Sequence, residues 1–199
     1  GHIPAVGLGT WQLGGRDCVR IVQQAIRLGY RHIDTAQMYG NEREVGQAVR
    51  ASGIDRSEVF VTSKLNNGFH RPAVARREFD RTLAALDLGY VDLFLIHSPL
   101  PGAYEADFVS TWRTLAEFHQ EGRARSVGVS NFQVAHLERL AAETDLVPAV
   151  NQVEVHPYVC NDTVRAYACA HGIVTEAWSP IARGKVLAEG TVTRIAAAV

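Results

Sequence analysis

The stretch VDLFLIHSPLPGAYEADFVSTWRTLAEFHQEGRARSVGVS, residues 91–130, contains one complete strand–helix–strand unit. Residues 91–97 form an almost continuous apolar run, which predicts a buried strand. Residues 111–120 carry apolar side chains at helical spacing, and Gly122 is suited to end that helix. Residues 124–130 return to the strand pattern. Two strands joined by a helix are expected to run parallel.

The same alternation extends in both directions along the chain. We expect strands over residues 6–10, 32–36, 59–65, 91–97, 124–130, 149–155 and 173–178, and helices over residues 17–28, 41–50, 72–88, 111–120, 133–144 and 163–170, with a further helix beginning near Val192. Seven strand–helix units of roughly even spacing predict an α/β fold with a parallel sheet.

Two architectures have such a sheet: an open doubly wound sheet and a closed (β/α)₈ barrel, the TIM barrel. The segment GLGTWQLGG, residues 7–15, lacks the third glycine that opens a helix in a dinucleotide-binding fingerprint. The even spacing therefore favours the barrel. An eighth strand–helix unit is absent, and such barrels typically have about 250 residues. We expect residues 1–199 to be a single barrel domain, incomplete at its C-terminus.

The composition excludes several classes of partner. The formal net charge is −1, so we expect no binding to nucleic acid or to an anionic membrane surface. No apolar run approaches the roughly 18 residues of a membrane span. The three cysteines, Cys18, Cys160 and Cys169, fit no zinc-binding spacing and predict free thiols in a reducing compartment. We expect a cytoplasmic monomer without a metal site.

Polar and aromatic residues follow the predicted strands where the strands end. In a barrel these ends meet at one mouth, which is where active sites lie. The residues are Asp34 with Tyr39 in the next loop, Lys64, His97, Ser130 with Asn131, Asn151 with Gln152, and Trp178 with Ser179. Their joint position predicts a functional site.

Three of these residues suit the reduction of a carbonyl group by hydride, which needs a proton donor at the carbonyl oxygen. Tyr39 could donate that proton if a nearby Lys64 ammonium lowered its pKa towards neutrality. A lysine near the barrel core needs a carboxylate partner, and Asp34 could supply it.

Other strand-end residues suit substrate and cofactor binding. His97 could hydrogen-bond the carbonyl oxygen. Ser130, Asn131 and Gln152 could pair with an amide such as a nicotinamide carboxamide, and Trp178 offers a flat face for a ring. Each residue also has an ordinary structural explanation, such as a turn cap, a surface tyrosine or a core tryptophan. Only the joint placement favours a function.

The segment GYRHIDTAQMYGNE, residues 29–42, resembles the signature of the aldo-keto reductases, in which an Asp and a Tyr follow the second barrel strand. Agreement in order and spacing continues through VTSKL (61–65), VDLFLIHSP (91–99), GVSNF (128–132), NQVEVHP (151–157) and EAWSP (176–180). The resemblance covers essentially the whole chain. The sequence is similar in character to the bacterial branch of this family, which includes the diketogluconate reductases.

The resemblance implies reduction of aldehydes or ketones with NADPH. It implies that Tyr39 is the general acid, that Lys64 and Asp34 form the ion pair that tunes it, and that His97 orients the substrate carbonyl. The cofactor-binding residues it implies are Ser130, Asn131, Gln152, Trp178 and Ser179. In the family, the Lys and Arg that bind the 2′-phosphate follow strand eight. Nothing here can be assigned to that role, so NADH also stays possible.

The substrate pocket departs from the family pattern. Ser98 stands where the family usually has Trp, and Asn66 stands where many members have Trp. These two changes predict a wider or more polar pocket. The resemblance implies that Trp11, in the loop after strand one, also lines this pocket. Glu154 and Glu176 lie in predicted strands without an obvious partner, and for Glu154 both a role at the mouth and a structural ion pair are open.

Two other functions are compatible with parts of the pattern. The barrel could be a non-catalytic relative that serves as a binding or scaffold protein. It could also be an isomerase or aldolase that uses Lys64 as a Schiff-base nucleophile. The complete set of Asp34, Tyr39, Lys64 and His97 favours the reductase. The physiological substrate and the direction of the reaction cannot be inferred from the sequence.

Overall fold

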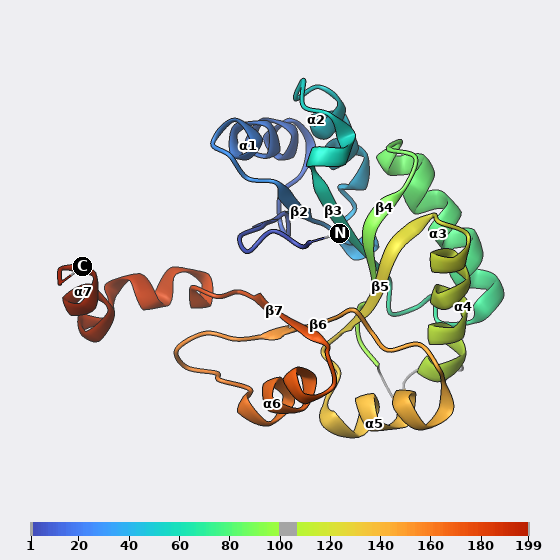
Figure 1. Ribbon diagram of the computed structural model, residues 1–199. Coiled ribbons are helices and arrows are strands. Elements are labelled where there is room, and N and C mark those ends of the chain that lie inside the picture. Colours follow the sequence, from blue (N-terminus) through green and yellow to red (C-terminus); the bar gives the residue numbers. More distant parts are fainter. Residues whose placement is uncertain (1, 100–106, 199) are drawn as a thin grey trace.

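The computed structural model describes residues 2–99 and 107–198 and arranges them as alternating strands and helices (Figure 1). The strands are β1 (Leu8–Gly9), β2 (His32–Asp34), β3 (Phe60–Leu65), β4 (Val91–Ile96), β5 (Ala124–Ser130), β6 (Val150–Glu154) and β7 (Val174–Trp178). The α-helices are α1 (Gly15–Arg27), α2 (Glu42–Arg50), α3 (Pro72–Leu86), α4 (Phe108–Gln120), α5 (Val134–Glu143), α6 (Asp162–Ala170) and α7 (Gly190–Ala196), and the 3₁₀ segments are η1 (Gln37–Tyr39), η2 (Arg56–Glu58) and η3 (Ala182–Ala188).

The seven strands form one parallel sheet in the order of the sequence, β1 to β7. This sheet is strongly curled. The side chain of Gln152 on β6 donates a hydrogen bond to Asp34 on β2 at 2.8 Å. Strands four places apart in a flat sheet would be separated by about 19 Å. The predicted barrel, with seven strand–helix units, is therefore confirmed.

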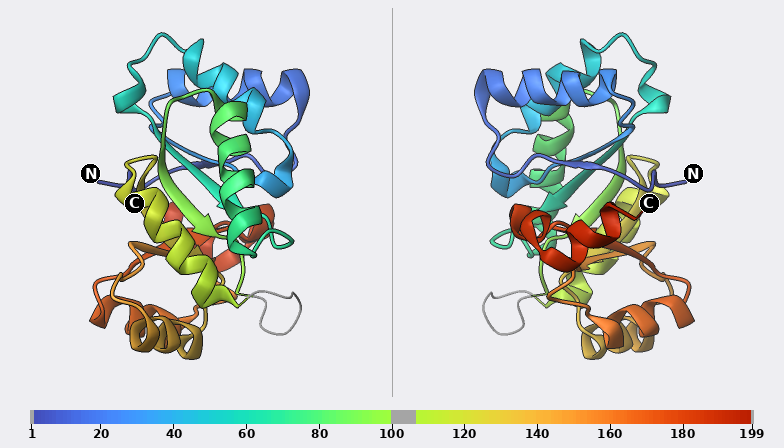
Figure 2. Two further views of the ribbon diagram at one scale, coloured as in Figure 1. Left: turned by 90° about the vertical axis from the view of Figure 1, so that its right-hand side faces the viewer. Right: turned by 90° about the vertical axis from the view of Figure 1, so that its left-hand side faces the viewer.

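The two faces of the sheet have different partners. On the outer face, side chains such as Ile33, Val61 and Phe94 are buried against the helices in one large apolar cluster. Helices surround the strands on that side, and η3 with α7 lies on the opposite side of the molecule from α3 and α4 (Figures 1 and 2). On the inner face, Leu93 and Leu95 form a smaller cluster with Val150. The polar site lies on this inner face.

Most expected elements are present within a few residues of the predicted limits. β1 is shorter than the predicted strand, because only Leu8 and Gly9 pair with β2. α4 begins at Phe108, three residues before the predicted start, because the Asp107 side chain caps it by accepting from the Val109 amide at 3.4 Å. η3 was not predicted. In the part of the chain that is described, no helix is long and apolar enough to cross a membrane.

Helices α2 and α3 approach closely at one glycine. A Cβ atom added at Gly46 would overlap the backbone carbonyl of Leu86 at the end of α3. The same carbonyl accepts a hydrogen bond from the Arg50 guanidinium at 2.5 Å, so two residues of α2, Gly46 and Arg50, contact it. This contact fixes the spacing of the two helices that flank the strand carrying Lys64.

Substitution of Gly46→Ala is expected to destabilise the fold by about 3 kcal/mol, because backbone has to move to admit one methyl group. The free energy of unfolding in urea measures the loss. Gly190→Ala is the matched control, since Gly190 has open space around its Cβ position in α7 and should change stability by no more than about 0.5 kcal/mol. Equal effects of the two substitutions would contradict the packing argument.

Candidate active site

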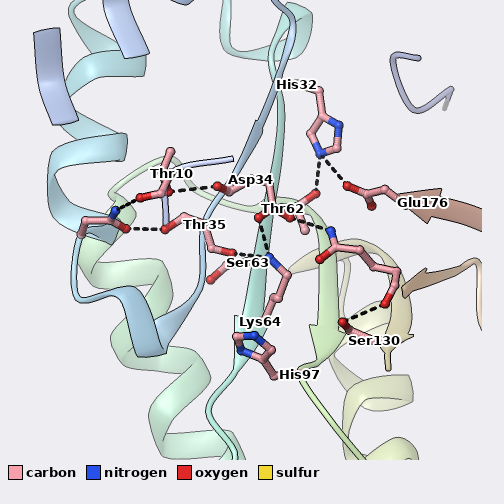
Figure 3. Close-up of polar contacts among 12 residues, drawn as sticks. Thr10, His32, Asp34, Thr35, Thr62, Ser63, Lys64, His97, Ser130 and Glu176 are labelled. Atoms are coloured by element: carbon pink, nitrogen blue, oxygen red, sulfur yellow. Dashed lines mark hydrogen bonds and ion pairs between the residues drawn. The ribbon is translucent and has the colours of Figure 1, made fainter. Parts of the chain in front are cut away.

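A buried ion pair lies at the centre of the inner face (Figure 3). The Lys64 ammonium, which is 0% exposed, donates to Asp34 Oδ1 at 2.5 Å and to the backbone carbonyl of Thr35 at 3.1 Å. The other oxygen of Asp34 accepts the bond from Gln152. Burial lowers the pKa of Lys64, but the Asp34 carboxylate and other nearby groups outweigh this effect and raise the pKa above its ordinary value. The predicted pairing of Lys64 with Asp34 is present, and the lysine is charged.

Tyr39 lies beside this ion pair. The Lys64 Nζ atom is 5.2 Å from the centre of the Tyr39 ring, and the Tyr39 and His97 rings meet edge to face at 5.9 Å. Lys64 lowers the pKa of Tyr39, which is the predicted direction. Burial has the larger, opposite effect, so the pKa of Tyr39 is raised above its ordinary value. The expected net lowering of the Tyr39 pKa is therefore wrong, because the depth at which the phenol is buried could not be inferred from the residue pattern.

His97 follows β4 and is largely buried. Burial and the nearby Lys64 charge lower the pKa of His97 to about 4, so its imidazole is neutral at physiological pH. Its Nδ1 atom is buried and has no hydrogen-bond partner among the described residues. A buried polar atom without a partner is costly, and this one lies next to the Tyr39 ring.

The amide and hydroxyl groups at the ends of β5 and β6 bond to one another. Asn131 donates through Nδ2 to the His97 carbonyl at 3.0 Å and accepts through Oδ1 from the Trp178 indole at 2.9 Å. The Ser130 hydroxyl donates to the Gln152 carbonyl at 2.9 Å. Asn131 has a left-handed backbone with φ of 62°, which asparagine tolerates better than most residues. The cluster thus joins the ends of β4, β5, β6 and β7.

The structure places the predicted pocket residues after the carboxyl ends of three parallel strands. Trp11 follows β1 and is 48% exposed, and the Arg183 guanidinium lies 4.7 Å from the centre of its ring. Asn66 follows β3, and its side-chain oxygen accepts from the Gly68 amide at 3.0 Å. Ser98 is half-buried after β4. Ser179, after β7, has a left-handed backbone with φ of 51°.

Sequence reasoning did not assign two inward-facing residues, His32 and Glu176, to the site. Glu176 on β7 is in register with Gln152 on β6, and its Oε1 atom lies 3.9 Å from His32 Nε2. Burial raises the pKa of Glu176 to about 7. The signal was available in the two-residue period of strands, because His32 shares a face with Asp34 and Glu176 shares one with Trp178.

Glu154 has an ordinary partner. Its carboxylate lies 3.1 Å from His156 Nε2, and its side chain is 37% exposed. Of the two possibilities that the sequence left open, the structure contains a structural pair, although the Glu154 side chain is partly exposed.

The family model for "Aldo/keto reductase family" matches residues 5–196 of the chain. The chain belongs to the aldo/keto reductase family. The resemblance predicted from the sequence motifs, and with it the class of oxidoreductase, is confirmed.

Individual relatives agree with this assignment. An aldo-keto reductase of Mycobacterium sp. (strain JLS) is 45% identical over 194 residues, which are 98% of this chain and 70% of that relative. Methylglyoxal reductase DkgA of Escherichia coli is 41% identical over 183 residues, covering 92% of this chain and 65% of that protein. A crystal structure of a putative 2,5-diketo-D-gluconic acid reductase B superposes with a TM-score of 0.91 at 39% identity, covering 97% of this chain and 68% of that one.

Substitution of Lys64→Met is expected to reduce the free energy of unfolding by about 4 kcal/mol, because it leaves the Asp34 carboxylate buried without a cation. Urea unfolding at neutral pH measures the loss. The double variant Lys64→Met with Asp34→Asn removes both charges and should be more stable than Lys64→Met alone. If the two losses simply added, the ion pair would have no coupling energy and the argument would be wrong.

Proposed function

We propose that this protein reduces aldehydes or ketones to alcohols with hydride from a nicotinamide cofactor, and that Tyr39 is the proton donor. The observation that carries this proposal is the convergence of four side chains from β2, β3 and β4 and the segments that follow them. Lys64 pairs with Asp34 at 2.5 Å, and the centre of the Tyr39 ring lies 5.2 Å from the Lys64 ammonium and 5.9 Å from the centre of the His97 ring. Family membership supports the same reaction class.

Tyr39 is suited to be a general acid that stays protonated until the substrate oxygen accepts the proton. Its raised pKa keeps the phenol protonated at neutral pH. When the carbonyl oxygen becomes an alkoxide, the phenol donates its proton and becomes negatively charged. The Lys64 ammonium, which the Asp34 carboxylate holds in place, lies 5.2 Å from the centre of the Tyr39 ring and stabilises the new charge.

His97 is suited to hold the substrate oxygen beside Tyr39. Because its imidazole is neutral, it donates a hydrogen bond without competing as a proton acid. The bond from Asn131 to the His97 carbonyl fixes the backbone that carries the ring.

The residues at the ends of β5 to β7 fit a nicotinamide group. A carboxamide has both donors and acceptors, and Asn131 Oδ1 can accept a second bond beyond the one from Trp178. Ser130 and Gln152 would complete that contact, Trp178 would stack on the ring, and Ser179 would lie beside it. When bound, the cofactor supplies the hydride. NADPH is preferred on the family resemblance, with NADH as the alternative.

The proposed substrate class follows from the pocket and from a relative. Ser98 and Asn66 leave more room at the rim than the tryptophans usual in the family. The E. coli relative is named a methylglyoxal reductase, which favours a small 2-oxoaldehyde as one substrate. We expect larger aromatic aldehydes to enter as well.

The two alternative functions have less support. A scaffold protein has no physical reason to bury a lysine ammonium at the cost of its desolvation. A Schiff-base mechanism needs a neutral amine. The raised pKa of Lys64 and its bonds to Asp34 and Thr35 favour the charged form instead.

Substitution of Tyr39→Phe is expected to lower the rate of NADPH oxidation with an aromatic aldehyde by at least about a hundredfold, the smaller end of the range for general acid catalysis. Loss of NADPH absorbance measures the rate. Tyr158→Phe is the matched control, because Tyr158 lies on the surface and its hydroxyl bonds to Glu189. If Tyr39→Phe kept full activity, Tyr39 would not be the proton donor. If the parent protein consumed no cofactor, the scaffold function would move ahead.

Substitution of Ser98→Trp is expected to reduce kcat/KM for a bulky aromatic aldehyde about tenfold more than for methylglyoxal, because it fills the rim with an indole ring. Steady-state kinetics with both aldehydes measure the ratio. Ser98→Ala is the control and should leave that ratio within about twofold, since it adds no bulk. An unchanged ratio in Ser98→Trp would show that position 98 does not limit the pocket.

A further inference from the structure

Glu176 reaches across the barrel interior towards the ion pair (Figure 3). It projects from β7 on the face that carries Gln152 on β6, and opposite it lie His32 and Asp34 on β2. One side-chain nitrogen or oxygen atom from each of His32, Asp34 and Glu176 lies within 4.8 Å of the other two. A second carboxylate therefore lies next to the one that holds Lys64.

The charges around this cluster do not balance if both carboxylates are ionised. The titratable groups that face Glu176 are His32 and Asp34 from β2, Lys64 from β3 and Tyr39 from η1. Lys64 is the cation among them, and Asp34 already pairs with it at 2.5 Å. Burial lowers the pKa of His32, so His32 adds no positive charge at neutral pH.

The surroundings of Glu176 suit a protonated carboxyl group. Its Oε2 atom is buried and has no hydrogen-bond partner among the described residues. His32 Nε2 lies 3.9 Å from Oε1 and is engaged with the Thr62 hydroxyl at 2.9 Å. Lys64 and a hydrogen bond from the Gln152 side chain favour the ionised carboxylate, but burial and the neighbouring Asp34 charge outweigh them and raise the pKa of Glu176.

We propose that Glu176 is a positioning residue of the catalytic ion pair, and that the loss of its proton makes Tyr39 a weaker acid. This inference rests on the proposed function of Tyr39. With Glu176 protonated, Asp34 and Lys64 form a neutral pair, and Lys64 can stabilise the tyrosinate that forms. When the proton leaves to solvent, the site gains a negative charge, which disfavours the tyrosinate. The Glu176 charge raises the pKa of Tyr39 in this way.

The test is the pH profile of kcat/KM for aldehyde reduction in the parent and in Glu176→Gln, which mimics the protonated side chain in shape and charge. Because the pKa of Glu176 is raised to about 7, the parent should lose activity through an inflection near that pH. The two proteins should have equal activity well below the inflection. Above it, kcat/KM of Glu176→Gln should be about threefold higher than that of the parent. On a logarithmic scale, this factor is about half of the tenfold change in acid strength that one pKa unit makes.

Thermal unfolding provides a readout that needs no turnover. Since the folded-state pKa of Glu176 lies above its ordinary value, the native state binds this proton more tightly. The free energy of unfolding of the parent therefore decreases as pH rises from the ordinary pKa of a glutamate to about 7. Above that pH the decrease is constant. Glu176→Gln should melt at the parent's temperature near pH 4 and about 5 °C higher near pH 8.

Two further variants separate a specific role from a structural one. Glu154→Gln makes the same chemical change on the neighbouring strand, where the carboxylate pairs with His156, and should keep the parent's inflection. Glu176→Asp keeps the titratable group and should retain an inflection. Loss of activity at every pH in Glu176→Gln, with a lower melting temperature, would mean that Glu176 is only structural and would overturn the proposal. A pH profile identical to the parent's would also overturn it.

If the parent showed no turnover, the proposed function would fail, and the inference would still be decided by the phenolate absorbance of Tyr39. The difference between each protein and its Tyr39→Phe counterpart isolates that signal. The titration midpoint of Tyr39 should be lower in the Glu176→Gln background than in the parent. An unchanged midpoint would overturn the coupling between Glu176 and Tyr39.

Discussion

The fully buried ammonium of Lys64 is the constraint on which the rest of the site depends. A charge without water must be matched by nearby negative charge and by acceptors in the right directions, and Asp34 and the Thr35 carbonyl supply them. Asp34 then needs a second donor, which Gln152 provides from the far side of the barrel. One cation thus ties β2, β3 and β6 together. The same hydrogen bonds and ion pair therefore join the strands of the curled sheet and form the polar site.

The Asp34–Lys64 pair also determines what the neighbouring groups can do. Its positive member faces Tyr39 and His97, where it favours a tyrosinate and disfavours an imidazolium. Its negative member lies towards Glu176, where it favours a protonated carboxyl group. The pKa values of His97 and Glu176 are shifted in the direction that the ion pair favours, whereas burial outweighs the effect of Lys64 on the pKa of Tyr39. Burial strengthens these effects because little water is available to screen them.

The sequence predicted the barrel and the identity of the strand-end residues, because both follow from local patterns. Apolar runs and helical spacing repeat along the chain, and parallel strands bring their ends together. It did not predict that Gln152 bonds to Asp34, 118 positions away, because that contact depends on the curvature of the sheet. It also gave the wrong direction for the net pKa shift of Tyr39. The sign depends on the depth of burial, which no residue pattern near Tyr39 encodes.

Asn131 has a consequence beyond its own hydrogen bonds. Its one amide group holds the backbone of His97 with its nitrogen and the indole of Trp178 with its oxygen. The surface proposed for the substrate oxygen and the surface proposed for the cofactor ring are therefore fastened to the same planar group, at a fixed separation. Sequence changes in the loops around the mouth therefore do not move one surface relative to the other. Such a shared anchor lets substrate preference evolve at the rim while the spacing across which hydride must pass stays constant.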